Sequence, residues 1–167
     1  MRNWTRTALC CVMLAAGWGP AMAEDATFRI TVMTPETALR VAQASLESCR
    51  SEGYQVAVVV VDRMGVPQVM IRDRFAGAHT PDTAFRKAWT AVSFRDDTLA
   101  LSENTAPGTP QGGARDITNA LMLGGGVPIE AGGAIIGGVG ISGAPSGQAD
   151  DECGRAGIEA VSGDLEF

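Results

Sequence analysis

A glycine-rich stretch near the C-terminal end constrains the fold of this chain more than any other feature. Residues 123–143 read LGGGVPIEAGGAIIGGVGISG and hold nine of the chain's 21 glycines. The segments VPIEA and AIIGGVGIS have the apolar character of strands, and Gly132 and Gly133 between them favour a tight turn. The pattern predicts a β-hairpin whose glycines let the strands approach a helix or a partner chain closely.

The same stretch ends in GVGISG, which matches the G-x-G-x-x-G pattern of dinucleotide-binding loops. Such a loop follows a strand, opens a helix and needs an acidic residue about 20 positions later, at the end of a second strand. The residues after the helix predicted over 150–161 are too few for a second strand and helix. We therefore expect a hairpin here and no nucleotide site.

The first 23 residues have the features of a secretory signal peptide. Arg2 and Arg6 precede the short apolar run ALCCVMLAAGW, and an A-x-A cleavage site follows at 21–23. The apolar run is shorter than the roughly 20 residues that span a bilayer, which argues against a membrane anchor. We expect cleavage after residue 23 and a periplasmic or secreted protein with a single domain, residues 24–167.

The charge of the predicted mature chain excludes one class of partner and its motifs give little support to catalysis. It carries 11 basic and 19 acidic residues, a net charge of −8, and the basic residues form no run. Such a surface repels phosphate backbones, so nucleic-acid binding is not expected.

The sequence shows no P-loop, no zinc-ligand spacing and no G-x-S-x-G nucleophile elbow. It therefore favours a binding protein over an enzyme.

Two Thr-Pro pairs mark expected helix starts. Thr34 and Thr80 each precede a proline, which places threonine at the N-cap and proline in the first turn, where its missing N–H costs nothing. Apolar residues at steps of three and four then predict one helix running to about Gly53 and another through Val92. Further helical segments are expected at 96–103, at 117–122 and at 150–161.

The strands of the first half are predicted by composition. QVAVVVVD (55–62) is almost wholly apolar, which is typical of a strand covered on both faces. The turn DRMG (62–65) leads to a partner strand at 66–72. Residues 28–33, FRITVM, are either an early strand or an extended lead-in to the first helix.

Two cysteines, Cys49 and Cys153, remain after the predicted cleavage. Both lie on apolar faces of predicted helices, near the two ends of the domain. An even number of cysteines in an exported protein permits a disulfide, and neither residue has the C-x-x-C neighbour typical of zinc sites. We predict a bond between them; the alternative is a pair of buried thiols that never meet.

Three blocks occur together: KAWTAVSFRDDTLAL (87–101), the glycine-rich stretch at 123–143, and a helix after the acidic run 150–152. With these blocks the chain resembles, from about residue 34 to 161, the GlcG/HbpS-like haem-binding family, which includes the C-terminal domain of PduO adenosyltransferases. The resemblance implies an α/β fold, a profilin-like three-layer α/β/α sandwich around an antiparallel sheet. It also implies homo-oligomers, and haem or corrinoid association in some members.

A haem site needs an axial ligand from His, Met, Cys or Tyr, an apolar slot and cations for the propionates. Some relatives use a histidine on the first helix, but the helix predicted over 35–52 contains none. The only histidine, His79, lies in RDRFAGAHTPDTAFRK (72–87), on a loop entering a helix. We expect His79 to bind the haem iron and Arg74 and Lys87 to meet the propionates. The alternative is a solvated loop without a ligand.

Other residues have open assignments. Thr90 shares a helix face with Lys87, so it lines the ligand cleft or a subunit contact, or simply bonds its own backbone. Met64, Met70 and Tyr54 are the next candidate iron ligands after His79. The acidic run 150–152 is explained by the dipole at a helix N-terminus, which stabilises carboxylates.

The sequence therefore predicts an exported protein that binds a small ligand, with haem or a related tetrapyrrole as the leading candidate. One alternative is an accessory or structural subunit without a cofactor, in which the glycine-rich hairpin serves assembly. The other is a small-molecule enzyme whose site lies at a subunit interface.

Overall fold

The computed structural model describes residues 26–165, so the predicted signal peptide at 1–23 lies outside the described residues. The compact unit begins at Thr31. Residues 26–34 form neither a helix nor a strand, so the early strand considered for 28–33 is absent. Within residues 26–165, no helix combines the length and the apolar character needed to cross a membrane.

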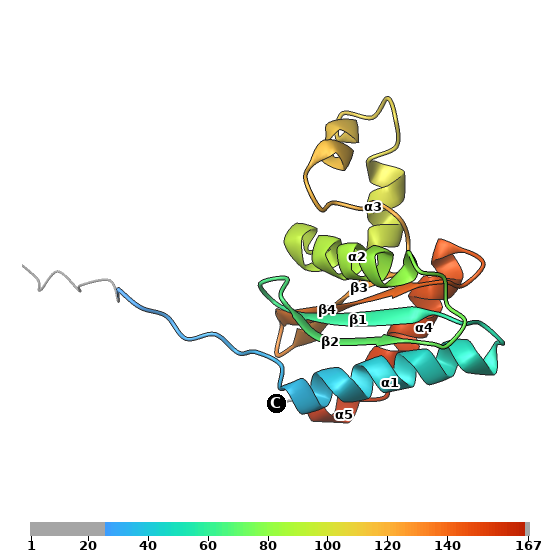
Figure 1. The fold of residues 1–167 in the computed structure, drawn as a ribbon. Coiled ribbons are helices and arrows are strands. Elements are labelled where there is room, and N and C mark those ends of the chain that lie inside the picture. The colour runs from blue at the N-terminus through green and yellow to red at the C-terminus, as the bar shows by residue number, and fades with distance from the viewer. Residues whose placement is uncertain (1–25, 166–167) are drawn as a thin grey trace, which may run out of the picture. The chain divides into compact units, whose positions relative to one another are not determined.

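Four antiparallel strands form one sheet in the order β2-β1-β4-β3 (Figure 1). The strands are β1 (Ala57–Asp62), β2 (Pro67–Arg72), β3 (Gly126–Ala131) and β4 (Ala134–Ser142). β3 and β4 are joined by Gly132 and Gly133, whose φ angles are 56° and 75°. Two successive positive φ angles are the signature of a tight hairpin turn, so the predicted hairpin is confirmed.

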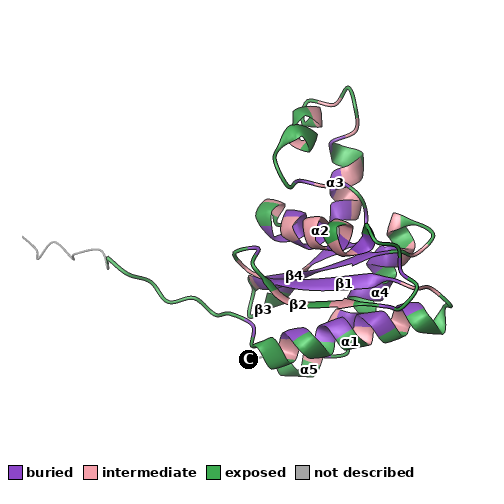
Figure 2. Cartoon of the chain, in the orientation of Figure 1, coloured by how far each residue is buried: buried purple, intermediate pink, exposed green. Residues whose placement is uncertain are grey.

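Helices cover both faces of the sheet in three layers (Figure 1). The helices α1 (Pro35–Ser51) and α4 (Gly147–Glu159) pack on one face, α1 against β1, with its Val58 and Val60, and β2, and α4 against β3 and β4. The helix α2 (Thr80–Phe94) packs on the other face, against Val59 and Val61. β1 is therefore buried on both sides, as its apolar run predicts (Figure 2). The expected three-layer α/β/α sandwich is confirmed.

The remaining elements are short. They are α3 (Thr98–Asn104), the 3-10 helix η1 (Gly112–Asp116) and α5 (Ser162–Leu165). The first of these confirms the helix predicted over 96–103.

The glycines of β4 let α2 lie directly on the strand. A Cβ atom added to Gly140 would overlap the carbonyl oxygen of Ala84 and lie 2.6 Å from the backbone N of Ala88. One added to Gly138 would lie 2.8 Å from Cγ1 of Val92. Real Cβ atoms do not approach other atoms so closely, so the predicted close approach of strand and helix is confirmed. The glycine-rich stretch serves packing.

The two Thr-Pro pairs behave differently. Thr34 caps α1, because its side chain accepts the N–H of Thr37 at 3.2 Å. Thr80 is instead the first residue of α2, and His79 occupies the N-cap position. The hydroxyl of Thr80 donates to the carbonyl of Gly77 at 2.8 Å, so it is not available as a cap. The predicted start of α2 was wrong by one residue.

The helix predicted over 117–122 is absent. Asn119 adopts a left-handed conformation with a φ of 70°, which ends any helical turn there. Beyond it, Ala120 and Met122 are buried two positions apart, a spacing typical of extended chain. Tertiary contacts from α2, described below, hold this segment in place.

A disulfide joins Cys49 of α1 to Cys153 of α4, and their Cα atoms are 5.5 Å apart. Both cysteines are buried. The bond therefore ties together the two helices that cover the same face of the sheet, and α4 is the helix that borders both clefts described next.

Candidate functional site

A cleft of about 910 Å³ lies between the start of α2 and the loop that connects β4 to α4. We call it the His79 cleft. Its volume falls within the range of about 300 to 1,000 Å³ that is usual for sites of small molecules and cofactors. One wall is the face of α2, and the opposite wall is the loop 142–147. The remaining lining residues include Tyr54, Gln55, Phe75, Leu121, Leu123 and Asp150.

The α2 wall follows from helical spacing. His79, Thr83, Arg86 and Lys87 all line the cleft, at positions 0, 4, 7 and 8 along the helix. Residues three and four apart lie on the same helix face. The spacing could have identified this face from the sequence, but only its first and last residues, His79 and Lys87, were predicted site residues.

The two side chains best suited to bind a metal centre meet in this cleft. The chain contains one histidine and one tyrosine, and both His79 and Tyr54 line it. His79 is exposed at the N-cap of α2, and Tyr54 is partly buried after the end of α1. The other two candidate ligands, Met64 and Met70, are exposed and do not line the cleft.

Two exposed apolar side chains line the cleft beside its polar groups. Phe75 is 80% exposed and Leu123 is 46% exposed, although both are large apolar side chains. Exposed apolar side chains beside polar groups on a concave surface suit a ligand that has both an apolar body and polar substituents.

The floor of the cleft is a buried ion pair that sequence reasoning missed. The ammonium group of Lys87 donates to Oδ2 of Asp150 at 2.7 Å and to the carbonyl of Ile141 at 2.9 Å. The two side chains are only 1% and 5% exposed. Burial lowers the pKa of Lys87 and raises the pKa of Asp150, and the attraction between them opposes both shifts.

This ion pair changes the roles expected for both partners. Lys87 lines the cleft, but its ammonium group is already bonded, so it is not a free cation for a propionate. Asp150 is more than a carboxylate at a helix N-terminus, because it is the buried partner of Lys87. The pair is separated by 63 residues in the sequence, and only a three-dimensional arrangement brings it together.

The other two predicted site residues do not line the cleft. Thr90 is buried; its hydroxyl donates to the carbonyl of Arg86 at 2.7 Å and accepts the N–H of Leu121 at 2.9 Å. It thereby holds the segment that carries Leu121 and Leu123 against α2. Arg74 is exposed and borders a neighbouring hollow of about 470 Å³, which shares Gln55 and Phe75 with the His79 cleft.

Arg86, a basic residue of the same predicted region, does line the cleft. Its guanidinium donates to the carbonyl of Ala120 at 2.9 Å, and more weakly to that of Asn119 at 3.5 Å. These bonds and that of Thr90 explain why residues 117–122 do not form a helix, because they satisfy its backbone groups from α2.

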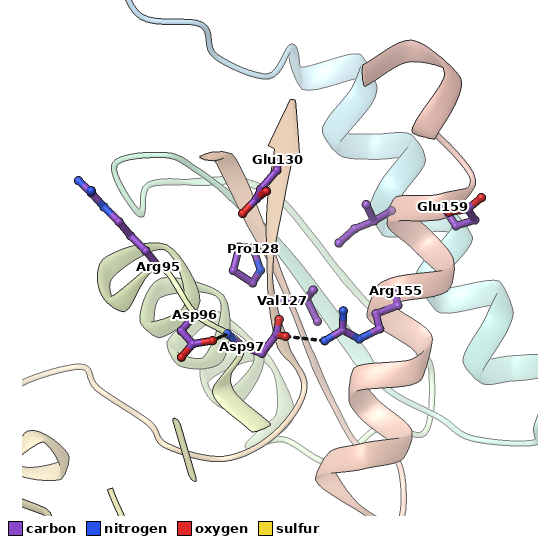
Figure 3. A pocket seen from close by; sticks show the side chains of 9 residues that line it. Arg95, Asp96, Asp97, Val127, Pro128, Glu130, Arg155 and Glu159 are labelled. Atoms are coloured by element: carbon purple, nitrogen blue, oxygen red, sulfur yellow. Dashed lines mark hydrogen bonds and ion pairs between the residues drawn. The ribbon is translucent and has the colours of Figure 1, made fainter. Parts of the chain in front are cut away.

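A second cleft, of about 530 Å³, lies beside β3 between the end of α2 and α4 (Figure 3). We call it the Arg155 cleft. Arg155 donates to Oδ2 of Asp97 at 2.6 Å and to Oδ2 of Asp151 at 2.7 Å. Asp151 is buried, its Oδ1 atom has no hydrogen-bond partner among the described residues, and burial raises its pKa. The lining holds six charged residues and no His, Tyr, Met or Cys.

Comparison with known proteins identifies relatives of the chain. The model of the family described as haem degrading protein HbpS-like matches residues 33–159. The crystal structure of a double mutant of Streptomyces reticuli HbpS is 37% identical and has a TM-score of 0.78, with 87% of this chain and 98% of that chain covered. A crystal structure of a PduOC–haem complex is 29% identical, with a TM-score of 0.73 and coverage of 78% and 95%.

A further relative is the corrinoid adenosyltransferase PduO of Salmonella typhimurium, which is 31% identical over 122 residues. The match covers 72% of this chain but only 36% of that protein. The chain therefore corresponds to about a third of that relative.

Proposed function

Because the chain belongs to the HbpS-like family of haem-degrading proteins, we propose that it binds haem in the His79 cleft. The observation that carries this proposal is that the chain's single histidine and single tyrosine line the same cleft. Imidazole nitrogen and phenolate oxygen are both axial ligands of haem iron in proteins. The haem in the PduOC complex, a protein of the same fold, supports the choice of ligand.

The residues of the cleft fit this group. His79 and Tyr54 offer the nitrogen and oxygen ligands, and the apolar side chains of Phe75, Leu121 and Leu123 can cover a macrocycle and exclude water from it. Bound haem would supply an iron centre whose reactivity depends on its axial ligand and on the polarity around it.

The propionates require a different assignment from the one expected. Lys87 is engaged by Asp150, and Arg74 lies outside the cleft. Arg86 and the N-terminus of α4, where Ser146 and Gly147 line the cleft, are the groups that can attract carboxylates. The positive end of a helix favours negative charge.

Titration of the purified protein with haemin tests the proposal. We expect a saturable Soret band, and we expect His79→Ala to shift that band and weaken binding by at least about tenfold, or roughly 1.4 kcal/mol. Tyr54→Phe distinguishes a second ligand from a wall residue, because only a ligand would shift the band. Met64→Leu is the matched control, since Met64 is exposed outside the cleft.

Two outcomes would overturn the proposal in different ways. Unchanged affinity and spectra in both His79→Ala and Tyr54→Phe would move the site elsewhere. Absence of a Soret band with the unaltered protein would favour a cofactor-free accessory subunit. If haem binds, following the band under air with a reductant separates stable binding from degradation, the activity in the family's description.

We further propose that the protein is exported and cleaved after Ala23. The features of residues 1–23 support this, and so does the buried Cys49–Cys153 bond, because disulfides persist in oxidising compartments. Intact mass of the exported form should correspond to a chain that begins at Glu24. A species that retains Cys10 and Cys11 would contradict the proposal.

We also propose that the protein assembles into homo-oligomers. The turn before β2 and the edge strand β2 itself expose Met64, Val66 and Met70, which supply apolar surface for a contact. Light scattering across a range of concentrations should give a mass above that of one chain. A monomer throughout that range would contradict this proposal without affecting the haem site.

A further inference from the structure

We propose that Lys87 and Asp150 are a positioning pair, whose bonds fix the wall of the His79 cleft formed by residues 142–147. Neither residue needs to touch the ligand for this role. The expected effect on haemin affinity rests on the proposed function. The expected effect on hydrogen exchange in the ligand-free protein does not.

The pair bonds the backbone at two points, just before the wall and in its middle. The Lys87 ammonium donates to the carbonyl of Ile141, the last residue but one of β4. Asp150 accepts the Lys87 ammonium with Oδ2 and the backbone N–H of Ala144 with Oδ1, at 3.0 Å. One lysine and one carboxylate therefore connect α2, the end of β4, the wall and the first turn of α4.

A glycine segment packs against the pair from the other side. A Cβ atom added to Gly125, whose φ is +110°, would lie 2.5 Å from Cβ of Asp150 and 3.0 Å from the Lys87 Nζ. One added to Gly124 would lie 3.0 Å from the backbone of Gly147, at the end of the wall. The segment 124–126 therefore packs closely against one side of the pair and of Gly147, while the cleft lies on the side of the wall that faces α2.

The position of the pair relates the wall to the proposed iron ligand. Lys87 lies eight residues after His79 on the same face of α2, so both side chains belong to one rigid helix. Because Lys87 and Asp150 bond α2 to the opposite wall, they set the distance between the two walls at the floor of the cleft. A cleft that must match a rigid macrocycle needs its walls fixed in advance.

Stability alone does not account for such a pair. The cost of removing two charges from water offsets most of their attraction, so well-packed apolar residues of similar size are often equally stable. Apolar residues cannot, however, bond the Ile141 carbonyl or the Ala144 N–H. A double variant that keeps the packing and removes these bonds therefore separates positioning from stability.

The double variant Lys87→Met, Asp150→Leu is the test. We expect it to remain folded with a melting temperature close to that of the unaltered protein, and to bind haemin at least about tenfold more weakly. In the ligand-free protein, we expect amide hydrogen exchange of residues 142–147 to become faster. The matched control is the double variant Arg40→Met, Asp164→Leu. It removes an exposed ion pair that lies away from the cleft and whose nitrogen and oxygen atoms are 2.8 Å apart.

The two readouts keep the outcomes distinct. Unchanged hydrogen exchange of residues 142–147 in the folded double variant overturns the positioning role, whether or not the affinity for haemin changes. If the unaltered protein binds no haemin, the proposed function fails and the exchange comparison still decides this one. Should the double variant not fold, Asp150→Asn decides: its amide can still meet Lys87 but cannot bond the Ala144 N–H as well, so unchanged exchange at Ala144 overturns the role.

Discussion

The two clefts of the compact unit both contain ion pairs, yet they offer a ligand very different groups. In the His79 cleft the ion pair is buried, and the other lining groups include an imidazole, a phenol, the guanidinium of Arg86 and the apolar side chains of Phe75 and Leu123. In the Arg155 cleft the guanidinium is about half exposed between two carboxylates, and most of the lining residues are charged. The richer charge pattern thus belongs to the cleft without a candidate iron ligand.

The two kinds of ion pair contribute to the protein in different ways. An exposed ion pair contributes little, because water and salt screen it and two long side chains must be ordered. A buried pair must be bonded, and its value lies in the backbone groups that it holds. The functional signal in this protein is therefore the type of donor atom lining a cleft, and the number of charges there carries less information.

The largest expected effect concerns α4, which borders both clefts. Replacing both cysteines, Cys49→Ser with Cys153→Ser, should lower the free energy of unfolding by about 4 to 5 kcal/mol, because a bond across 104 residues restricts the unfolded chain. Urea denaturation of the two proteins measures this. Counting thiols under denaturing, non-reducing conditions checks that the disulfide is present. Two free thiols per unaltered chain would show that it is not.

The next effect concerns the packing of α2 on β4, because α2 forms one wall of the His79 cleft. Gly140→Ala places a Cβ atom against the backbone of α2 at Ala84 and Ala88, so the helix must shift. We expect a loss of about 3 kcal/mol in unfolding experiments, since overpacking a closed contact is costly. Gly113→Ala is the control, because a Cβ atom there meets nothing within 4 Å. Equal stability of the two variants would mean that α2 does not lie on β4 as described.

A smaller effect should separate the clefts directly. Arg155→Met removes the partner of the buried Asp151 carboxylate and should cost about 1 to 3 kcal/mol of stability. It should leave haemin affinity unchanged, because Arg155 does not line the His79 cleft. The matched control is Arg95→Met, on the opposite side of the same cleft and pointing away from Asp97 (Figure 3). Weaker haemin binding by Arg155→Met would contradict the placement of the ligand in the His79 cleft.

The smallest effect is a dependence on pH. The guanidinium of Arg50 donates to Asp73 at 2.7 and 3.1 Å and lowers the pKa of that carboxyl below its ordinary value of 3.8. A lowered pKa in the folded state means that the stabilisation is present above about pH 4 and is lost as the pH falls below it. Asp73→Asn should therefore show a shallower decline of melting temperature between pH 5 and about 2. An identical pH profile would indicate that the pair contributes nothing.

Much of the fold was predictable because local patterns and the final packing agree. The apolar run of β1 requires cover on both faces, and two glycines of positive φ mark the hairpin turn of β3 and β4. The segment 117–122 could not be predicted, because hydrogen bonds from Arg86 and Thr90 override its helical composition.

The candidate site was predictable only in part. His79 stands out as the single histidine, and helical spacing relates it to Lys87. The partnership of Lys87 with Asp150 was not predictable, since no local pattern joins residues so far apart. Arg74 was a predicted site residue because it is close to His79 in the sequence. The chain turns between the two residues, so Arg74 borders the neighbouring hollow and not the His79 cleft.

Hydrogen–deuterium exchange of the unaltered protein, with and without haemin, tests most directly which cleft holds the ligand. Binding in the His79 cleft should slow exchange in residues 75–87 and 142–147, which form its walls. Residues 95–97 and 155–159, which line the Arg155 cleft, should exchange at the same rate in both states. Protection confined to the second set of residues would contradict the proposed site.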